Sequence, residues 1–141
     1  MKNLLKIALL FAFPLLLINC GDDDDSSPLD ALVGEWQSAA LTISGCANSE
    51  DNGTITCDPF CFNIEFSSNG SYTLQEADFE SGQITTQSGT ATVTGTTILL
   101  CETGDDCSDE DPASYVKTSD SSLTITFTED GCQFTIVFTK Q

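Results

Sequence analysis

Apolar and polar residues alternate with a period of two through most of the chain after residue 28. In the clearest run, Phe60, Phe62, Ile64 and Phe66 share one face. Successive side chains of a β-strand point to opposite sides of the sheet, so this period indicates strands that are buried on one side. No helical stripe of comparable length appears in this part of the sequence. The pattern predicts an all-β domain.

Short turn signals connect the alternating runs. Asn69-Gly70 directly follows the first run, Gly95 divides a second pair of runs, and Asp130-Gly131 divides the last pair. Asn-Gly and Asp-Gly tolerate the positive φ angles that tight hairpin turns need. Consecutive hairpins predict an antiparallel meander, in which each strand pairs with the next.

The runs and turns together define about eight strands. We predict them at Glu35–Ser44, Phe60–Ser67, Ser71–Phe79, Gln83–Gln87, Gly89–Thr94, Thr97–Glu102, Ser114–Lys117 and, as a hairpin of two, Leu123–Thr139. The count becomes nine if the fourth and fifth segments are separate strands. A meander this long avoids exposed edges most simply by closing into an up-and-down barrel, and a β-sandwich is the alternative.

The first predicted strand contains an irregularity. Trp36 and the pair Leu41 and Ile43 lie on opposite faces if the strand alternates strictly. One extra residue in a strand reverses the parity of everything that follows it. We therefore expect a bulge near Ala39-Ala40.

The first 19 residues have the features of an export signal. Lys2 and Lys6 precede an apolar run that is too short for a comfortable membrane span. The run ends in Leu17-Ile18-Asn19-Cys20, which resembles a bacterial lipobox, although Asn19 replaces the usual small residue. The resemblance implies that Cys20 is acylated and anchors the protein to a membrane. The alternative is an ordinary signal peptide that leaves Cys20 as a structural thiol.

Residues 20–28 have the composition of a disordered tether. They contain Asp22-Asp23-Asp24-Asp25, followed by two serines and a proline. A block of like charge cannot bury apolar surface. The segment resembles the acidic tether of Bacteroidetes lipoproteins, which acts as a surface-export signal. That resemblance implies an outer-membrane lipoprotein exposed at the cell surface, and the alternative is a solvated spacer.

The remaining residues, Leu29 to Gln141, number 113 and are sufficient for one domain with one core. They carry 18 acidic residues against Lys117 and Lys140, a net charge of −16, and the whole sequence has no Arg or His. Phosphate contacts need basic side chains, so nucleic-acid binding is excluded as a function. Strong charge of one sign favours a soluble monomer and can attract cations.

Six cysteines remain if Cys20 carries lipid. They are Cys46, Cys57, Cys61, Cys101, Cys107 and Cys132. An even number in an exported chain predicts disulfides, with about fifteen pairings open. A zinc site is the competing interpretation, but the spacings are not those of a zinc ribbon and no histidine can complete a mixed site.

Catalytic chemistry has little support in the sequence. Without histidine, Ser-His-Asp and Cys-His nucleophile systems cannot form, and no glycine-rich loop has phosphate-binding spacing. The carboxylate pair Glu76 and Asp78 matches a glycosidase only in residue type. We therefore predict a protein that is not an enzyme and needs no cofactor.

The acidic loop from Thr103 to Pro112 is the one candidate for a metal. Asp105, Asp109 and Asp111 alternate as calcium ligands sometimes do, but Cys107 occupies the third position of an EF-hand pattern. The preferred interpretation is a solvated loop pinned by Cys101 and Cys107, with no metal.

The segment Leu32-Val33-Gly34-Glu35-Trp36 contains the only tryptophan of the chain. Gly-x-Trp at the start of a first strand, a cysteine after that strand, and a Phe-rich strand that leads into Ser68-Asn69-Gly70-Ser71-Tyr72 together resemble the lipocalin-like lipoproteins of Bacteroidetes. The resemblance covers most of Leu29 to Lys140. It implies that the glycine turns a short helical segment into the first strand and that the indole closes one end of the barrel.

The chain lacks the arginine that those proteins stack on the motif tryptophan. Lys140 closes the last predicted strand, and barrel closure would bring that strand beside the first. We therefore expect Lys140 to lie over or beside Trp36.

A barrel of this size either fills with side chains or keeps one small ligand. The candidate inward-facing ligand residues are Trp36, Phe62, Ile64, Phe66, Tyr72, Ile125, Phe127, Phe134 and Ile136. Two functions of different classes follow. The first is a surface-anchored module that holds a small apolar molecule, in at most a shallow pocket. The second is an accessory or structural lipoprotein whose barrel is filled and whose exterior binds a protein partner.

Overall fold

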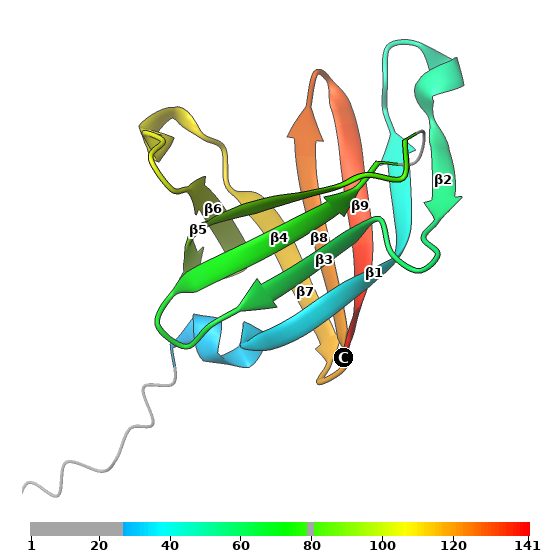
Figure 1. The fold of residues 1–141 in the computed structure, drawn as a ribbon. Helices are drawn as coiled ribbons and strands as arrows, with labels where there is room; N and C mark the ends of the chain where they lie inside the picture. Colours follow the sequence, from blue (N-terminus) through cyan, green and yellow to red (C-terminus); the bar gives the residue numbers. More distant parts are fainter. Residues whose placement is uncertain (1–26, 79–80) are drawn as a thin grey trace, which may run out of the picture.

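The computed structural model describes residues 27–78 and 81–141, which build one antiparallel sheet that curls into a barrel (Figure 1). Three short 3-10 helices accompany it: η1 (Pro28–Leu32), η2 (Ser49–Asp51) and η3 (Cys107–Asp109). The strands are β1 (Gly34–Ser44), β2 (Gly53–Thr56), β3 (Phe62–Phe66), β4 (Ser71–Ala77), β5 (Ile84–Thr94), β6 (Thr97–Glu102), β7 (Ala113–Ser119), β8 (Ser122–Glu129) and β9 (Cys132–Lys140).

The pairing of β1 with β9 closes the barrel. From β3 onward, consecutive strands pair with each other as far as β9. β9 then pairs with β1, from Trp36↔Lys140 to Ser44↔Gln133. On its other side, β1 pairs first with β3 and then, beyond the end of that ladder, with β2. Eight strands therefore form the barrel and β2 is an extra strand beside it. The predicted up-and-down barrel is confirmed, and the β-sandwich alternative is wrong.

The bulge expected in β1 is present. The register with β9 shifts between Ser38 and Ala40, so that Trp36 and Leu41 both become buried. Ser38 is also buried, and its Oγ accepts hydrogen bonds from the amides of Cys61 and Phe62 at 2.9 Å and 2.8 Å. The bulge therefore also fixes the start of β3.

The segments 83–87 and 89–94 form one continuous strand, β5, as the count of about eight strands assumed. The first half of β5 is exposed. Gly89 lies where β5 approaches β6 so closely that a Cβ would collide with the backbone of Cys101 and Glu102. Strand β2 was not predicted, because all four of its residues are exposed and give no period of burial.

One end of the barrel is closed by the Gly34–Trp36 segment, as its sequence resemblance implied. Helix η1 leads into Gly34, whose φ of 121° is accessible mainly to glycine. Trp36 is fully buried, and its Nε1 donates to the carbonyl of Leu32 at 2.7 Å. The motif therefore joins the helical turn η1, which buries Leu29 and Leu32, to the first strand at the closed end.

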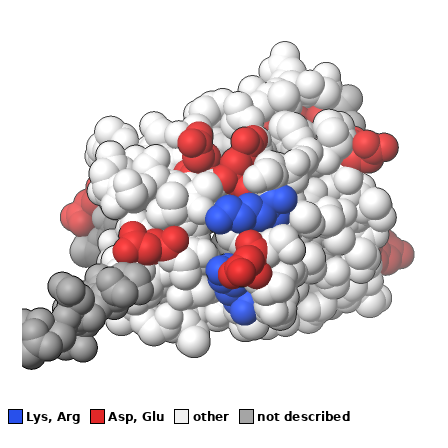
Figure 2. Space-filling view, turned by 90° about the horizontal axis from the view of Figure 1, so that it is seen from below, with Lys and Arg blue, Asp and Glu red and all other residues white. Residues whose placement is uncertain are grey.

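Lys140 covers this end from the outside. Its Nζ lies 5.3 Å from the centroid of the Trp36 ring and donates to the carbonyl of Val33 at 2.9 Å. A Cβ on Gly34 would come within 2.9 Å of Lys140 Cε, so the glycine also makes room for the lysine. The predicted contact between Lys140 and Trp36 is confirmed. Figure 2 views the molecule from this side, where lysine side chains lie close to carboxylates.

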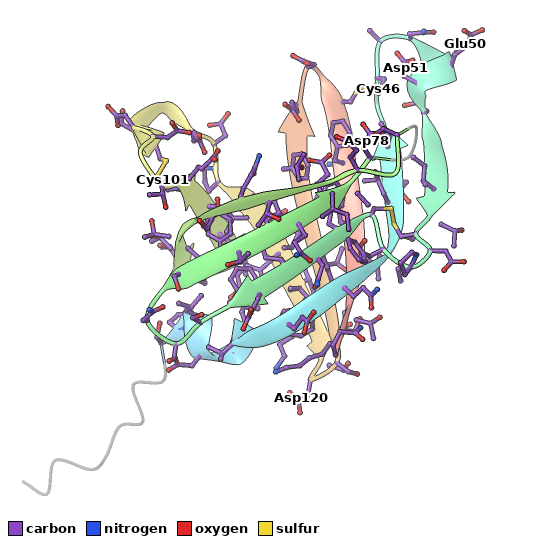
Figure 3. The ribbon with its side chains drawn as sticks, viewed as in Figure 1. Cys46, Glu50, Asp51, Asp78, Cys101 and Asp120 are labelled. Carbon is purple, nitrogen blue, oxygen red and sulfur yellow. A yellow bond between two sulfur atoms is a disulfide. The ribbon has the colours of Figure 1, made fainter. Side chains whose placement is uncertain are left out.

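The six cysteines form three disulfides. Cys46 pairs with Cys132, Cys57 with Cys61, and Cys101 with Cys107, as expected for the last pair. The first bond joins the loop after β1 to the start of β9, on the seam where the barrel closes. In Figure 3, Cys46 and Cys101 are labelled on opposite sides of the upper end of the barrel.

We expect the two half-buried disulfides to differ in their effect on stability. Cys46–Cys132 links residues 86 apart and Cys101–Cys107 links residues 6 apart. Loop-closure entropy predicts that Cys46→Ala with Cys132→Ala lowers the free energy of unfolding by about 4–5 kcal/mol, and the matched Cys101→Ala with Cys107→Ala pair by about 2 kcal/mol. Denaturant unfolding of both double variants measures the difference. Equal losses in the free energy of unfolding, or a larger loss in the Cys101 and Cys107 variant, would contradict the loop-closure explanation.

Replacement of Lys140 should expose its role at the closed end. Lys140→Gln removes the charge over the indole and is expected to lower the free energy of unfolding by about 1 kcal/mol. The emission of Trp36 should change as well, because the ring loses its adjacent cation. Lys140→Arg should keep both properties, whereas Lys117→Gln should leave the Trp36 emission unaltered. An unchanged emission spectrum in Lys140→Gln would show that the contact is absent in solution.

Candidate functional site

A cavity of about 570 Å³ lies inside the barrel, away from the Trp36 end. This volume falls in the range of pockets that take small organic ligands, roughly 300–1,000 Å³. Its wall contains Phe62, Ile64, Leu74, Ile98, Leu99, Leu100, Glu110, Asp111, Ala113, Ile125, Phe127, Thr128, Glu129, Ile136 and Phe138. Eleven of these fifteen residues are apolar, so the interior is partly filled but retains room for a ligand.

Strand periodicity explains why the wall is apolar. Phe62 and Ile64 belong to the inner face of β3, and Ile125 and Phe127 belong to that of β8. β9 contributes Ile136 and Phe138 in the same way. Alternate residues of each strand share a face, so the same pattern that builds the core also lines the cavity.

The cavity reaches the surface where β6 and β7 separate. Only two residue pairs, Thr97↔Ser114 and Ile98↔Ala113, join these strands in the described ladder. The pairing of β7 with β8 begins at Ser114↔Thr126, so the last residues of β8 extend beyond β7. The connection from Thr103 to Pro112 borders this opening with its last residues, Glu110 and Asp111. Its Glu110 and Asp111, together with Thr128 and Glu129, are exposed and form the polar rim of the cavity.

The rim is acidic because the inward-facing rows of several strands end in carboxylates. Glu76 follows Leu74, Glu102 follows Leu100 and Glu129 follows Phe127, each two residues further along its strand. Asp111 precedes Ala113 by the same interval. Residues two apart in a strand share a face, so these carboxylates continue the lining of the cavity toward its mouth. We call Glu110, Asp111 and Glu129, which line the cavity directly, the acidic rim.

The field of this acidic end extends into the core. Burial raises the pKa of the Tyr72 phenol above its usual value, and the carboxylates of Glu102, Glu110 and Asp105 raise it further. Tyr72 is buried on β4 and pairs with Gly89 of β5, which in turn pairs with Glu102. A negative charge on the Tyr72 phenol is therefore disfavoured both by desolvation and by neighbouring carboxylates.

The structure divides the nine predicted ligand residues into two groups, although all nine belong to the core or pack against it. Phe62, Ile64, Ile125, Phe127 and Ile136 line the cavity. Trp36, Phe66, Tyr72 and Phe134 do not.

Packing explains why these four residues lie outside the cavity wall. Trp36 is at the closed end, and Phe66 and Tyr72 face each other across β3 and β4 beside the turn at Gly70. Phe134 stacks on Phe127, with ring centroids 5.1 Å apart. Whether the residues of either group bind a ligand remains a prediction.

The acidic rim was not predicted as part of the site, although the sequence contains a signal for it. Glu129 continues the alternation of Leu123, Ile125 and Phe127 by one further step. The apolar part of this row ends at Phe127, so a pattern of apolar residues does not include Glu129. The positions of Glu110 and Asp111 depend on the path of the 103–112 connection, which periodicity does not specify.

The calcium candidate in the 103–112 loop was proposed on Asp105, Asp109 and Asp111. The side chain of Asp109 lies outside the described residues. Among the side chains that the structure does describe, no three His, Cys, Asp or Glu residues form a group that could hold a metal ion. In the same loop, Asp106 caps η3, because its carboxylate accepts a hydrogen bond from the backbone amide of Ser108 at 3.1 Å.

The export signal, Cys20 and the acidic aspartates fall within residues 1–26, outside the described part of the chain. Within residues 27–78 and 81–141, none of the helices has the length and apolar character to span a membrane.

No protein-family model matches the chain, and no curated protein matches it in sequence. Solved structures do match its fold. A lipocalin-like protein from Bacteroides uniformis shares 18% sequence identity with a TM-score of 0.53, over 79% of this chain and 99% of that one. An uncharacterized protein from Bacteroides eggerthii shares 15% identity with a TM-score of 0.52, over 77% of this chain and 98% of that one. The chain therefore has the lipocalin-like fold.

Proposed function

We propose that this protein is a lipid-anchored, cell-surface module that holds a small apolar molecule in its barrel. The observation that carries the binding role is the cavity of about 570 Å³ with its mostly apolar wall. A barrel filled by its own side chains would leave no such volume. The accessory role, in which the exterior binds a protein partner, is the alternative if the cavity takes no ligand.

The cavity supports retention rather than catalysis. Its described polar lining is limited to Thr128 and the three carboxylates of the acidic rim, all at the mouth. Ser-His-Asp and Cys-His nucleophile systems cannot form, because the sequence lacks histidine. Burial of apolar surface is then the main source of affinity, at roughly 25 cal/mol per Å².

The anchoring proposal depends on the sequence before the barrel. The run that ends at Cys20 has the order of a lipoprotein signal, and three disulfides in the barrel fit an exported, oxidising environment. The proposed surface location is supported by Asp22–Asp25, which follow Cys20 after Gly21 and resemble the acidic tether of Bacteroidetes lipoproteins.

Replacement of Cys20 tests the anchor. Cys20→Ser should release the protein from membranes or leave an unprocessed precursor, because the acyl chains that hold it cannot be attached. Membrane fractionation and electrophoretic migration measure both outcomes. Cys57→Ser with Cys61→Ser serves as the control, since it removes thiols without touching the signal. A Cys20→Ser protein that fractionates and migrates like the wild type would eliminate the lipid anchor.

Filling the cavity tests the ligand role. Soluble Cys20→Ser protein should bind the neutral alcohol decanol saturably, with a Kd in about the micromolar range, as measured by displacement of a polarity-sensitive dye. Ala113 lines the cavity, so Ala113→Phe should weaken binding by about tenfold or more by occupying the space. Val116→Phe is the matched control, because Val116 lies on the same strand but is 59% exposed.

Denaturant midpoints of the two variants establish that both are folded. Absence of saturable decanol binding by the otherwise unchanged protein would eliminate the ligand role and favour the accessory one. Equal weakening by both phenylalanine variants would show that the alcohol does not occupy this cavity.

A further inference from the structure

The lysines of the described residues and the carboxylates at the cavity mouth lie at opposite ends of the barrel. The two lysines of the described chain, Lys117 and Lys140, lie at the closed end. Both are already engaged. Lys140 Nζ donates to the carbonyl of Val33 at 2.9 Å, and Lys117 Nζ forms an ion pair with Asp120 at 2.8 Å. Asp120 is labelled at the bottom of the barrel in Figure 3, opposite the labelled Cys101.

The mouth of the cavity has the opposite charge. Glu110, Asp111 and Glu129 are in its wall, and the inward-facing rows that end in Glu76 and Glu102 add carboxylates at the same end. No arginine exists anywhere in the sequence to compensate them. A ligand held in the cavity would therefore have its outer end beside carboxylates alone among the described charged groups.

We propose that the cavity selects a cationic amphiphile, with an apolar body among Phe62, Ile125 and Ile136 and a protonated amine at the acidic rim. This inference rests on the proposed ligand role and specifies its chemical class. The cavity is the site, and the rim determines which head group is accepted. A positively charged head group gains Coulomb attraction from each carboxylate, whereas a fatty-acid carboxylate meets like charge and finds no free cation.

The electrostatics of the core agree with this selection. Burial, together with the carboxylates of Glu102, Glu110 and Asp105, disfavours a negative charge at Tyr72 on β4. The carboxylates of the acidic rim act in the same direction on an anionic head group at the mouth of the cavity. Specificity arises here from repulsion of the anionic head group as well as from attraction of the cationic one.

The test uses three probes with the same ten-carbon body: decylamine, decanol and decanoate, each below its micelle concentration at neutral pH. Soluble Cys20→Ser protein is titrated with each probe against the same polarity-sensitive dye. We expect the order decylamine, decanol, decanoate, with decylamine at least about tenfold tighter than decanoate. Added salt should weaken decylamine binding and leave decanol binding unchanged, because only the former is screened.

Variants of the rim isolate the cause. Glu129→Gln and Asp111→Asn should each weaken decylamine binding by about fivefold and leave decanol binding unaltered. Glu50→Gln is the matched control, since Glu50 is an exposed carboxylate on η2 and is labelled at the upper right of Figure 3, away from Cys101. Glu50→Gln should change neither decylamine binding nor decanol binding.

The outcomes separate this inference from the proposed function. If decanol binds but decylamine is no tighter than decanoate, the cavity is a ligand site and the head-group selection is wrong. If the rim variants weaken decanol as much as decylamine, they act on the fold of the mouth and the charge argument is wrong. If none of the three probes binds, both proposals are eliminated.

Discussion

The ladder between β1 and β9 joins the first strand of the barrel to the last, and the rest of the molecule depends on that closure. An open sheet of the same strands would expose two long edges and could not enclose a volume. The ladder needs the shift between Ser38 and Ala40, because only with it do Trp36 and Leu41 both reach the interior. The Cys46–Cys132 bond lies at one end of the ladder and the contact of Lys140 with Trp36 at the other. Covalent, aromatic and hydrogen-bonding interactions thus all reinforce one seam.

On the opposite side of the barrel, the pairing between neighbouring strands is short. β6 and β7 share only two residue pairs, and the end of the 103–112 connection, whose first half is closed by the Cys101–Cys107 disulfide, borders the resulting gap. Incomplete pairing at this point contributes to the mouth of the cavity, because Glu110 and Asp111 of the connection and Glu129 at the end of β8 line it there. The acidic character of the mouth therefore arises beside the gap in the sheet.

Much of this architecture could be predicted from the sequence, because burial on one face produces a period that is visible in β3, β8 and β9. The bulge in β1 was predictable for the same reason, since Trp36 and Leu41 break that period. Strand β2 was not predicted, because an exposed strand has no such period.

The candidate site was predicted less completely than the fold. Inward orientation does not distinguish a side chain that fills the core, such as Phe66, from one that borders free space, such as Ile125. That distinction depends on the packing of neighbouring strands. The contribution of Glu110 and Asp111 depends on the path of a connection without regular structure, which no sequence period describes.

The position of η1 determines how the cavity is oriented relative to the point where the chain enters the domain. Leu29 and Leu32 are buried against the end that Trp36 closes, so the chain enters the barrel at its floor (Figure 1). The mouth at the end of β8 opens on the far side. A protein held by a lipid at Cys20 would consequently present its opening to the surrounding medium, with the closed end toward the bilayer. Ligand exchange would then take place with molecules in solution, and lateral transfer from the supporting membrane would require the domain to turn over on its tether.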